Sequence, residues 1–406
     1  MQQAELLAPA GNFDRLRFAL HYGADAVYCG GKQLGLRSFA ENFTMDELRA
    51  AAAQCHALGK KLFVTVNAFL KDSDLGFLDE YLDALGESGV DALIVTDPAV
   101  IMTAKKRIPH MELHLSTQAN TLNSRSAAFW HELGVRRVVL ARELSLEEIR
   151  ELRQNTPDSL ELEAFVHGAM CVSYSGRCLL SNFLNGREGN RGACVQPCRW
   201  KYELREQGKD GLWMPVEEDG RGTYFLNSRD LNMIAHLREL HEAGVSSFKI
   251  EGRMKTVFYV AAVTNAYRMA MDGALAGRPF DPALEAELEK LRHRPYTTGF
   301  YFPGAQTEQT TGDDYPQTYD FVAIVLEQGV DGRVLVEQRN RFFLGDRLEA
   351  LSPGSLGHPL RVLSIEDEAG QSRQSAPHPC ERLWLRVDAP LSPGDLLRKQ
   401  CAAQTV

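Results

Sequence analysis

The sequence predicts an α/β protein built on a (β/α)8 barrel of the TIM type, with a long insertion between strands seven and eight and a small all-β domain after it. Eight short apolar runs alternate with amphipathic helical stretches over the first 260 residues. Alternation of this kind is typical of parallel strands joined by helices. Eight such units are the number that closes a barrel.

The eight predicted strands can be followed in order along the chain. They read AELLAPAG, ADAVYCGG, KLFVTVNAF, DALIVTD, ELHLSTQAN, RRVVLARE, LELEAFVHG and SSFKIEGRMK. Helices are expected between them, for example over Met45 to Leu58, Leu75 to Gly89 and Ser145 to Gln154. An open doubly wound sheet is the alternative, but APAGNFD stands where its glycine-rich phosphate fingerprint would follow the first strand.

Two domains are expected, one over residues 1–300 and one over residues 310–406. The first is the barrel, and its insertion covers about residues 168–245. In the second, short apolar runs are separated by Gly, Pro and Asp, a pattern that predicts a small β-barrel or sandwich. Its five expected strands are Asp320 to Leu326, Arg333 to Glu337, Asp346 to Ala350, Leu360 to Ile365 and Leu383 to Val387. They carry no catalytic cluster, so we expect this domain to bind substrate.

Composition and charge limit the class of protein. The net charge is −9, which excludes a strong non-specific binder of nucleic acid but not a local basic patch. The N-terminus lacks the basic start and apolar stretch of a secretory signal, and no apolar run approaches the length of a membrane-spanning helix. A cytoplasmic protein that does not enter membranes is expected.

Polar residues stand at the carboxyl ends of the predicted strands, where barrels of this kind carry their active sites. They include Asn67, Gln118, Arg142 and His167. In the last strand, Lys249, Glu251 and Arg253 alternate and therefore share one face. We expect Lys249 and Glu251 to pair below Arg253, which then faces an anionic substrate. The alternative is a closed ion network that only stabilises the barrel.

Four of the eight cysteines lie in one segment. Cys171, Cys178, Cys194 and Cys198 are separated by six, fifteen and three residues, with glycines between them. Thiols clustered in a cytosolic protein favour an iron–sulfur cluster, a zinc ion or redox chemistry over structural disulfides. We predict these four cysteines as ligands, with Cys29 as a substitute for one of them. An iron–sulfur cluster is favoured, and zinc or no metal are the alternatives.

The cysteine segment is also basic. Between Cys171 and Arg205 the cations Arg177, Arg187, Arg191, Arg199, Lys201 and Arg205 face the anions Glu188 and Glu203, six minus two, a net of +4. A local positive field of this kind suits a phosphate or carboxylate. We assign substrate binding to Asn67, Gln118, Arg142, Lys249 and Arg191, and catalysis to His167, Glu251 and Arg253.

Several motifs together resemble the U32 peptidase-like family. They are ELLAPAGN, ADAVYCGG, HGAMCVSYSGRC, NRGACVQPCRW and FKIEGRMK, in that order over about residues 4 to 270, and the β-rich tail is similar to the family's. PVEEDGRGTYFLNSRDL and the tail resemble its tRNA-hydroxylating branch. The resemblance maps the family's cysteine motif onto Cys171, Cys178, Cys194 and Cys198.

The resemblance implies an oxygen-independent hydroxylase that binds a [4Fe-4S] cluster and takes its hydroxyl group from prephenate. It implies the wobble uridine of a tRNA anticodon loop as the target and 5-hydroxyuridine as the product. The alternatives are a U32-type, collagenase-like peptidase, or hydroxylation of another RNA or of a quinone precursor. The sequence contains no HExxH or GxSxG motif, which counts against a protease. A protein partner or a second copy of the chain stays open.

Overall fold

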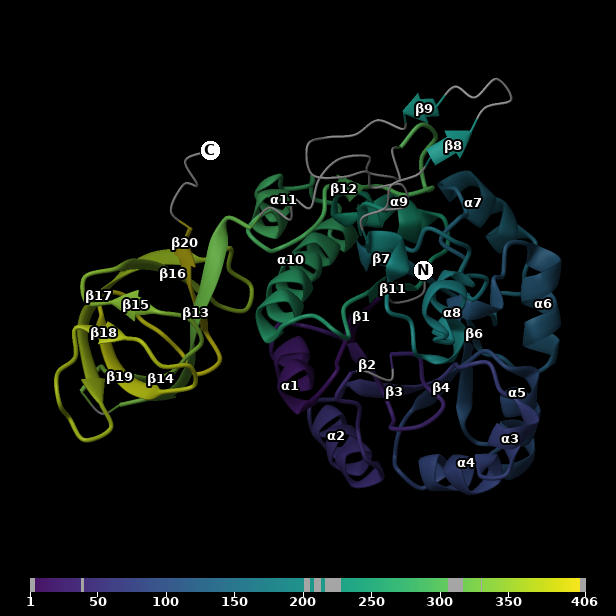
Figure 1. The fold of residues 1–406 in the computed structure, drawn as a ribbon, viewed down its shortest axis with the longest axis horizontal. Helices are drawn as coiled ribbons and strands as arrows, with labels where there is room; N and C mark the ends of the chain where they lie inside the picture. The colour runs from purple at the N-terminus through teal and green to yellow at the C-terminus, as the bar shows by residue number, and fades with distance from the viewer. Residues whose placement is uncertain are drawn as a thin grey trace. The chain divides into compact units, whose positions relative to one another are not determined.

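Eight parallel strands close a barrel in the first part of the chain (Figure 1). The computed structural model describes residues 4–37, 40–200, 205–207, 213–215, 228–305, 317–329 and 331–401, the two three-residue segments by backbone alone. The barrel strands are β1 (Glu5–Pro9), β2 (Ala26–Gly30), β3 (Lys61–Val66), β4 (Ala92–Val95), β5 (Glu112–Leu115), β6 (Arg137–Val139), β7 (Glu161–Ala169) and β11 (Ser247–Ile250). β11 pairs with both β1 and β7, which closes the ring and confirms the predicted fold class.

Helices alternate with these strands and lie outside the ring in Figure 1. They are α1 (Phe13–His21), α2 (Met45–Ala57), α3 (Asp72–Leu75), α4 (Leu78–Gly86), α5 (Pro98–Arg107), α6 (Ser124–Glu132), α7 (Leu146–Gln154) and α9 (Leu237–Glu242). The local sequence determines where some of these helices begin. Thr44 and Glu47 form a capping box at α2, and Ser145 and Glu148 form one at α7. None of the described helices is both long and apolar enough to cross a membrane.

The insertion follows β7 and returns to the barrel at β11. It contains α8 (Leu180–Asn185), the short 3-10 turns η2 (Gly189–Arg191) and η3 (Pro197–Arg199), a small hairpin of β8 (Arg205–Gln207) and β9 (Trp213–Pro215), β10 (Asp230–Asn232) and a further 3-10 turn, η4 (Ile234–His236). β10 pairs antiparallel with the end of β7 and carries β12 (Tyr296–Thr297) on its other side. The insertion therefore extends the barrel sheet at the carboxyl end of β7.

The barrel interior is filled from several strands. Leu7, Ala26, Phe63 and Ile94 belong to one buried apolar cluster inside the ring. Buried charges lie beside it: Arg137 of β6 forms ion pairs with Glu5, Glu161 and Glu163. Buried charges are tolerated when they are paired, so this network accounts for the polar residues in the strands.

The second compact unit comprises residues 17–23, 256–293 and 315–406. It contains α10 (Val257–Leu275), α11 (Ala283–Leu288) and a closed antiparallel barrel, in the order β13 (Tyr319–Gln328), β14 (Val334–Gln338), β19 (Arg382–Val387), β17 (His358–Asp367), β16 (Arg347–Leu351) and β20 (Leu396–Gln400). β15 (Phe342–Phe343) pairs with β18 (Ser375–Ala376). The five predicted strands are present. The sequence analysis did not predict β20, whose run LLRKQ contains two charged residues, or the two-residue strands.

Arg398 of β20 provides a test of the second unit. The side chain is fully buried and bonds in a bidentate manner to Glu287 of α11 and, at 2.6 Å, to Glu349 of β16. Arg398→Leu leaves both carboxylates without this partner, so it should lower the free energy of unfolding by about 3–5 kcal/mol in urea titrations. Arg373→Leu breaks an exposed pair with Asp367 and should change it by less than about 1 kcal/mol. Equal effects of the two substitutions would contradict this assignment.

Candidate active site

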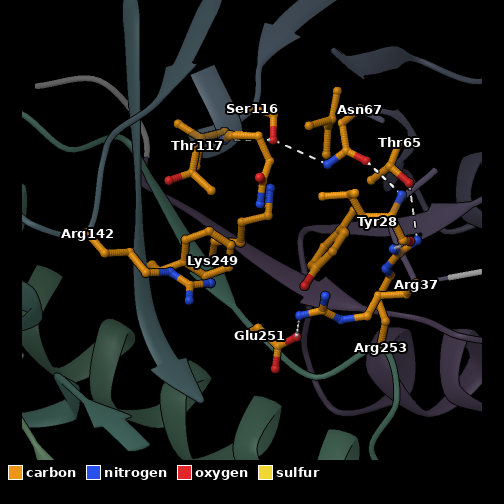
Figure 2. A pocket seen from close by; sticks show the side chains of 15 residues that line it. Tyr28, Arg37, Thr65, Asn67, Ser116, Thr117, Arg142, Lys249, Glu251 and Arg253 are labelled. Atoms are coloured by element: carbon orange, nitrogen blue, oxygen red, sulfur yellow. Dashed lines mark hydrogen bonds and ion pairs between the residues drawn. The ribbon is translucent and has the colours of Figure 1, made fainter. Parts of the chain in front are cut away.

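A pocket opens at the carboxyl ends of the barrel strands (Figure 2). It encloses about 530 Å³ of empty space, counting its open mouth. Its lining is Tyr28, Leu36, Arg37, Thr65, Asn67, Ile94, Ser116, Thr117, Gln118, Val139, Arg142, Phe165, Lys249, Glu251 and Arg253. Six of the eight predicted catalytic and substrate-binding residues are among them, and His167 and Arg191 are not.

Strand alternation explains why β11 and the residue that follows it deliver two charges to the pocket. Lys249 and Glu251 point inward, and Ile250 between them is fully buried on the other side. Arg253 follows two residues later and also reaches the pocket. The predicted shared face of Lys249, Glu251 and Arg253 is therefore present.

The pairing expected within this face is wrong. Lys249 Nζ lies 2.7 Å from Glu163 Oε1 of β7, and not beside Glu251 as predicted. Glu251 instead faces Arg37, with 3.7 Å between the nearest carboxylate oxygen and guanidinium nitrogen. The reason is geometric, because neighbouring strands bring side chains closer than two positions on one strand do.

Arg253 is 4% exposed and is held from two directions. Its guanidinium donates a hydrogen bond to Thr65 Oγ1 at 3.1 Å and another to the Leu36 carbonyl. A side chain at Gly30 would place its Cβ 2.3 Å from Arg253 Nη1, so any larger residue there would displace the guanidinium. Burial lowers the pKa of Arg253, but an arginine in this position stays charged.

Arg142 lies on the opposite wall of the pocket (Figure 2). Its guanidinium carbon sits 3.9 Å from the centre of the Phe165 ring, and Nη1 donates to the Ala169 carbonyl at 2.9 Å. Within the described part of the chain, neither Arg142 nor Arg253 forms an ion pair with a carboxylate. Lys249 is paired with Glu163 and Glu251 faces Arg37, so Arg142 and Arg253 are two pocket cations without an ion-paired carboxylate among the described residues.

Two predicted amides complete the polar wall. Asn67 accepts a hydrogen bond from the Leu36 N–H at 3.1 Å and donates one to Ser116 Oγ at 3.2 Å. Gln118 lies in the turn η1 (Thr117–Ala119) that follows β5. Asn67 thus links the loop after β2 to the end of β5, and its role is to fix the shape of the pocket.

His167 lies outside the pocket. It pairs in register with Ile250, and β7 carries one extra residue, Val166, at this point of the ladder. A bulge of this kind reverses which side chains point inward. Because Ile250 points away from the pocket, His167 does too, and its ring packs 5.5 Å from the ring of Tyr296. The sequence pattern could not reveal the bulge, and the catalytic role of His167 stays a prediction.

Arg191 also lies outside the pocket, in a contact that anchors the insertion. Its guanidinium forms two hydrogen bonds with the Asp74 carboxylate, at 2.6 and 3.1 Å, and one with the Phe69 carbonyl at 2.6 Å. Glu188 adds a third polar partner for this guanidinium. Arg191 therefore ties the cysteine segment to the loop after β3, and its predicted role in substrate binding stays a prediction.

The sequence analysis missed several pocket residues. Tyr28, Thr65, Ser116 and Thr117 line the pocket, and so does Arg37. Strand alternation could have indicated Tyr28 and Thr65. Each lies two positions before a residue at a strand end and therefore points to the same side of its strand as that residue. Arg37 carried no such signal. It sits in an irregular loop with a left-handed backbone (φ 72°), which no periodic pattern predicts.

The cysteine segment is docked beside the pocket. A Cβ at Gly176 would lie 2.7 Å from the carbonyl of Gln118, a pocket residue, so the turn between Cys171 and Cys178 packs directly on η1. The Phe69 N–H also donates to the Asn190 carbonyl at 3.3 Å. Of the predicted basic segment, Lys201 and Glu203 lie outside the described residues, as do the side chain of Arg205 and most of PVEEDGRGTYFLNSRDL.

The four predicted ligand cysteines lie within electrostatic reach of one another. Burial raises the pKa of the Cys198 thiol to about 11, and Cys171, Cys194 and Cys178 each add to the rise. The Gln196 N–H donates to Cys194 Sγ at 3.4 Å. Thiols gathered around Cys198 in this way fit a cationic metal group, which binds them as thiolates.

The metal site itself is less defined. Among the residues that the structure describes, no three His, Cys, Asp or Glu side chains are arranged to hold one metal ion. The ligands of a four-iron cluster each bind a different iron, so they stand further apart than the ligands of one ion. Cysteine thiolates are the donors that hold such a cluster, so the donor type fits, and the ligand assignment stays a prediction.

Cys29 does not face the pocket. It lies between the inward-facing Tyr28 and Gly30 on β2 and is fully buried toward Cys55 of α2. Burial raises the pKa of the Cys29 thiol to about 12. The idea that Cys29 replaces one ligand assumed a position at the barrel mouth, and the alternation of β2 places its side chain elsewhere.

Comparison with known families identifies the chain. Residues 11–311 match the model of "Peptidase family U32", and residues 317–398 match that of "Peptidase family U32 C-terminal domain". This chain belongs to family U32. The two matches follow the division into an α/β barrel and an antiparallel β-barrel.

Three curated relatives of this U32 protein are similar over much of the chain. "tRNA hydroxylation protein P1" of Bacillus subtilis is 40% identical, over 98% of this chain and 95% of its own. "tRNA hydroxylation protein P" of Escherichia coli is 38% identical, over 95% and 94%. "23S rRNA 5-hydroxycytidine C2501 synthase" of Escherichia coli is 39% identical, over 68% of this chain and 40% of its own.

The buried Lys249–Glu163 pair predicts a pH-dependent part of stability. Burial alone would raise the pKa of Glu163, but Lys249 and Arg137 lower it to about 2. Its contribution is therefore present above about pH 4.5 and is lost as the pH falls toward 2, in total about 3 kcal/mol. The difference in unfolding free energy between the parent and Glu163→Gln should shrink by about 2 kcal/mol from pH 5 to pH 3. A constant difference would contradict the pair.

Proposed function

We propose that this U32 protein hydroxylates RNA and that its substrate is tRNA. Two relatives named for tRNA hydroxylation match it over nearly the whole of both chains, so both domains are shared with them. The observation that carries the proposal in this structure is a cationic pocket next to a docked segment with four cysteines. A substrate and a metal group would meet there.

The proposed target is the wobble uridine of an anticodon loop, and the product is 5-hydroxyuridine. Loop nucleotides are unstacked, so a base can turn outward without disrupting a duplex. The pocket, of about 530 Å³ with its mouth, lies within the size range of small-molecule sites. A uridine base would enter it from the open side, and tRNA as a substrate agrees with a location in the cytoplasm.

Prephenate is the proposed source of the hydroxyl group. It carries two carboxylates, and two cations of the pocket, Arg142 and Arg253, form no ion pair with a carboxylate of the described residues. Arg142 and Arg253 present planar guanidinium groups, which bind a carboxylate through two parallel hydrogen bonds. Arg253 is already held by Thr65 and Leu36, so it offers a fixed edge, whereas Arg142 rests on the Phe165 ring.

Glu251 is the one carboxylate among the residues that line the pocket. Exchange of the C5 hydrogen of uridine for the hydroxyl group of prephenate oxidises uridine by two electrons and reduces prephenate by two, and a base must take up the C5 proton and pass it to the reduced product. Glu251 is placed to do so, and Arg37 beside it steadies the carboxylate. Lys249 is fixed by Glu163 and contributes charge to the pocket floor.

Cys171, Cys178, Cys194 and Cys198 are the proposed ligands of a [4Fe-4S] cluster, with zinc as the alternative. When bound, such a cluster supplies one-electron chemistry or a Lewis-acidic iron. Arg199 follows the last ligand, and its charge is felt by both Cys198 and Glu251. Arg199 is therefore within electrostatic reach of both the last cysteine and a pocket residue.

A peptidase is the competing function, because the family model carries that name. A cysteine or serine peptidase needs a histidine beside its nucleophile. The pocket lining includes Ser116 but neither a histidine nor a cysteine, and Ser116 Oγ accepts hydrogen bonds from Asn67 and the Gln118 N–H. The described pocket therefore supports hydroxylation and gives a peptidase no catalytic pair.

The ligand set can be tested on anaerobically purified protein. The parent should be brown, absorb at about 400 nm and carry about four irons per chain. Changing any one of Cys171, Cys178, Cys194 or Cys198 to Ser should remove most of the iron and the absorbance. Cys380→Ser, at an exposed cysteine of the second unit, should leave both unchanged. A colourless parent with one zinc per chain would exclude the cluster.

The proposed activity can be tested in a strain that lacks this protein. Mass spectrometry of its tRNA nucleosides should show the loss of 5-hydroxyuridine and its derivatives, and the parent chain should restore them. The Arg142→Gln variant should restore at least about tenfold less 5-hydroxyuridine at limiting prephenate, because one charged hydrogen bond contributes about 1.5–3 kcal/mol. The matched control is Arg136→Gln, directly before β6, whereas Arg142 follows that strand; Arg136 pairs with Glu161, and its variant should restore fully. Unchanged nucleosides in the deletion strain would refute the proposal.

A further inference from the structure

One pair of arginines in the second unit stands out because of its register. Arg347 of β16 lies directly opposite Arg361 of β17 in the antiparallel ladder. Paired residues in such a ladder point to the same side of the sheet, and like charges in these positions repel. Both side chains are exposed. Within the described residues, neither guanidinium has an ion pair or a hydrogen bond to the protein.

The other charged pairs in the same barrel follow the opposite rule. Across the described ladders, Glu337 faces Arg382, Glu349 faces Arg398, and Asp320 faces Lys399. Each of these places a carboxylate opposite a cation. The Arg347–Arg361 pair is therefore a local exception that lowers stability, and folding gives no reason for it.

An exposed aromatic ring lies next to this pair. Phe343 of β15 is 41% exposed, with the Arg341 guanidinium carbon 4.9 Å and the Lys399 ammonium nitrogen 5.7 Å from its ring centre. The loop from Phe343 to Arg347 is bound to β17, because the Gly345 N–H donates to the Val362 carbonyl at 2.9 Å. The Arg361 guanidinium lies over this turn, with Nη2 4.0 Å from where a Cβ at Gly345 would stand, so the arginine pair borders the turn that carries the ring.

We call Arg341, Phe343, Arg347, Arg361 and Lys399 the basic face. Two carboxylates lie near it. Asp346 is bound to Lys399 Nζ at 2.7 Å, and Asp388 accepts a hydrogen bond from the Arg361 backbone N–H. Counting both against the four cations leaves two positive charges, on a chain whose net charge is −9. The basic face therefore attracts anions although the whole molecule is acidic.

We propose that the basic face binds the RNA backbone of the tRNA substrate, with Arg347 and Arg361 on phosphates and Phe343 against a base or ribose. This rests on the proposed function and deepens it by naming a binding surface in the C-terminal domain. A pair of opposed cations is stabilised when a phosphate enters between them. An exposed ring flanked by cations is a stacking platform for nucleotides. Phosphate and base recognition side by side are the chemistry of nucleic acid.

The test uses the full chain and an unmodified tRNA transcript. In Arg347→Gln/Arg361→Gln the Kd at 0.15 M salt should rise about tenfold, and the slope of log Kd against log salt should fall by about two. The thermal midpoint should stay equal or rise, because a repulsion is removed. The matched control, Arg373→Gln/Arg382→Gln, loses two exposed arginines that face Asp367 and Glu337 and should keep the parent's slope.

Several outcomes would overturn the proposal. The first is a slope and Kd equal to those of the control. The second is weaker binding together with a lower thermal midpoint, which would assign a structural role to the pair. The third is unchanged tRNA binding with loss of binding to vesicles rich in phosphatidylserine, which would assign the face to membranes. Failure of the proposed function would appear separately, as unchanged nucleosides in the deletion strain.

Discussion

The buried ion pair between Lys249 and Glu163 is the interaction on which the barrel interior depends. It lies between β11 and β7, the two strands that close the ring, and Arg137 connects it to Glu5 of β1. A buried carboxylate without these cations would be protonated or would destabilise the barrel. Because the network neutralises Lys249 from below, the charges above it determine which ligand the pocket accepts.

Those upper charges connect the fold to the proposed chemistry. Arg253 is fixed by Thr65 and Leu36, and Gly30 leaves it the room it needs. Gly176 packs on Gln118, so the cysteine segment is set against the wall of the same pocket. One rigid floor therefore supports an anion site on one side and a thiol-rich segment on the other. An enzyme that brings a dicarboxylate to a metal cluster needs this combination.

Much of the fold was predictable from the sequence, because each barrel strand is a short apolar run next to a helical one. Period-two alternation also placed Lys249, Glu251 and Arg253 correctly at the mouth. The alternation pattern failed where the direction or the partner of a side chain depends on a neighbouring strand. The extra residue Val166 turns His167 out of the pocket, and Lys249 finds its partner on β7. Arg37 could not be predicted, because its loop has no period and its backbone is left-handed.

The central claim is that Arg142 and Arg253, the two pocket cations without an ion pair among the described residues, select a dianion. Calorimetric titration of the purified chain with prephenate, and with the monocarboxylate phenylpyruvate, tests it most directly. The account predicts that prephenate binds at least about tenfold more tightly, since each charged hydrogen bond contributes about 1.5–3 kcal/mol, and that added salt weakens the preference. Equal affinity for the two compounds, or no binding of prephenate, would contradict it.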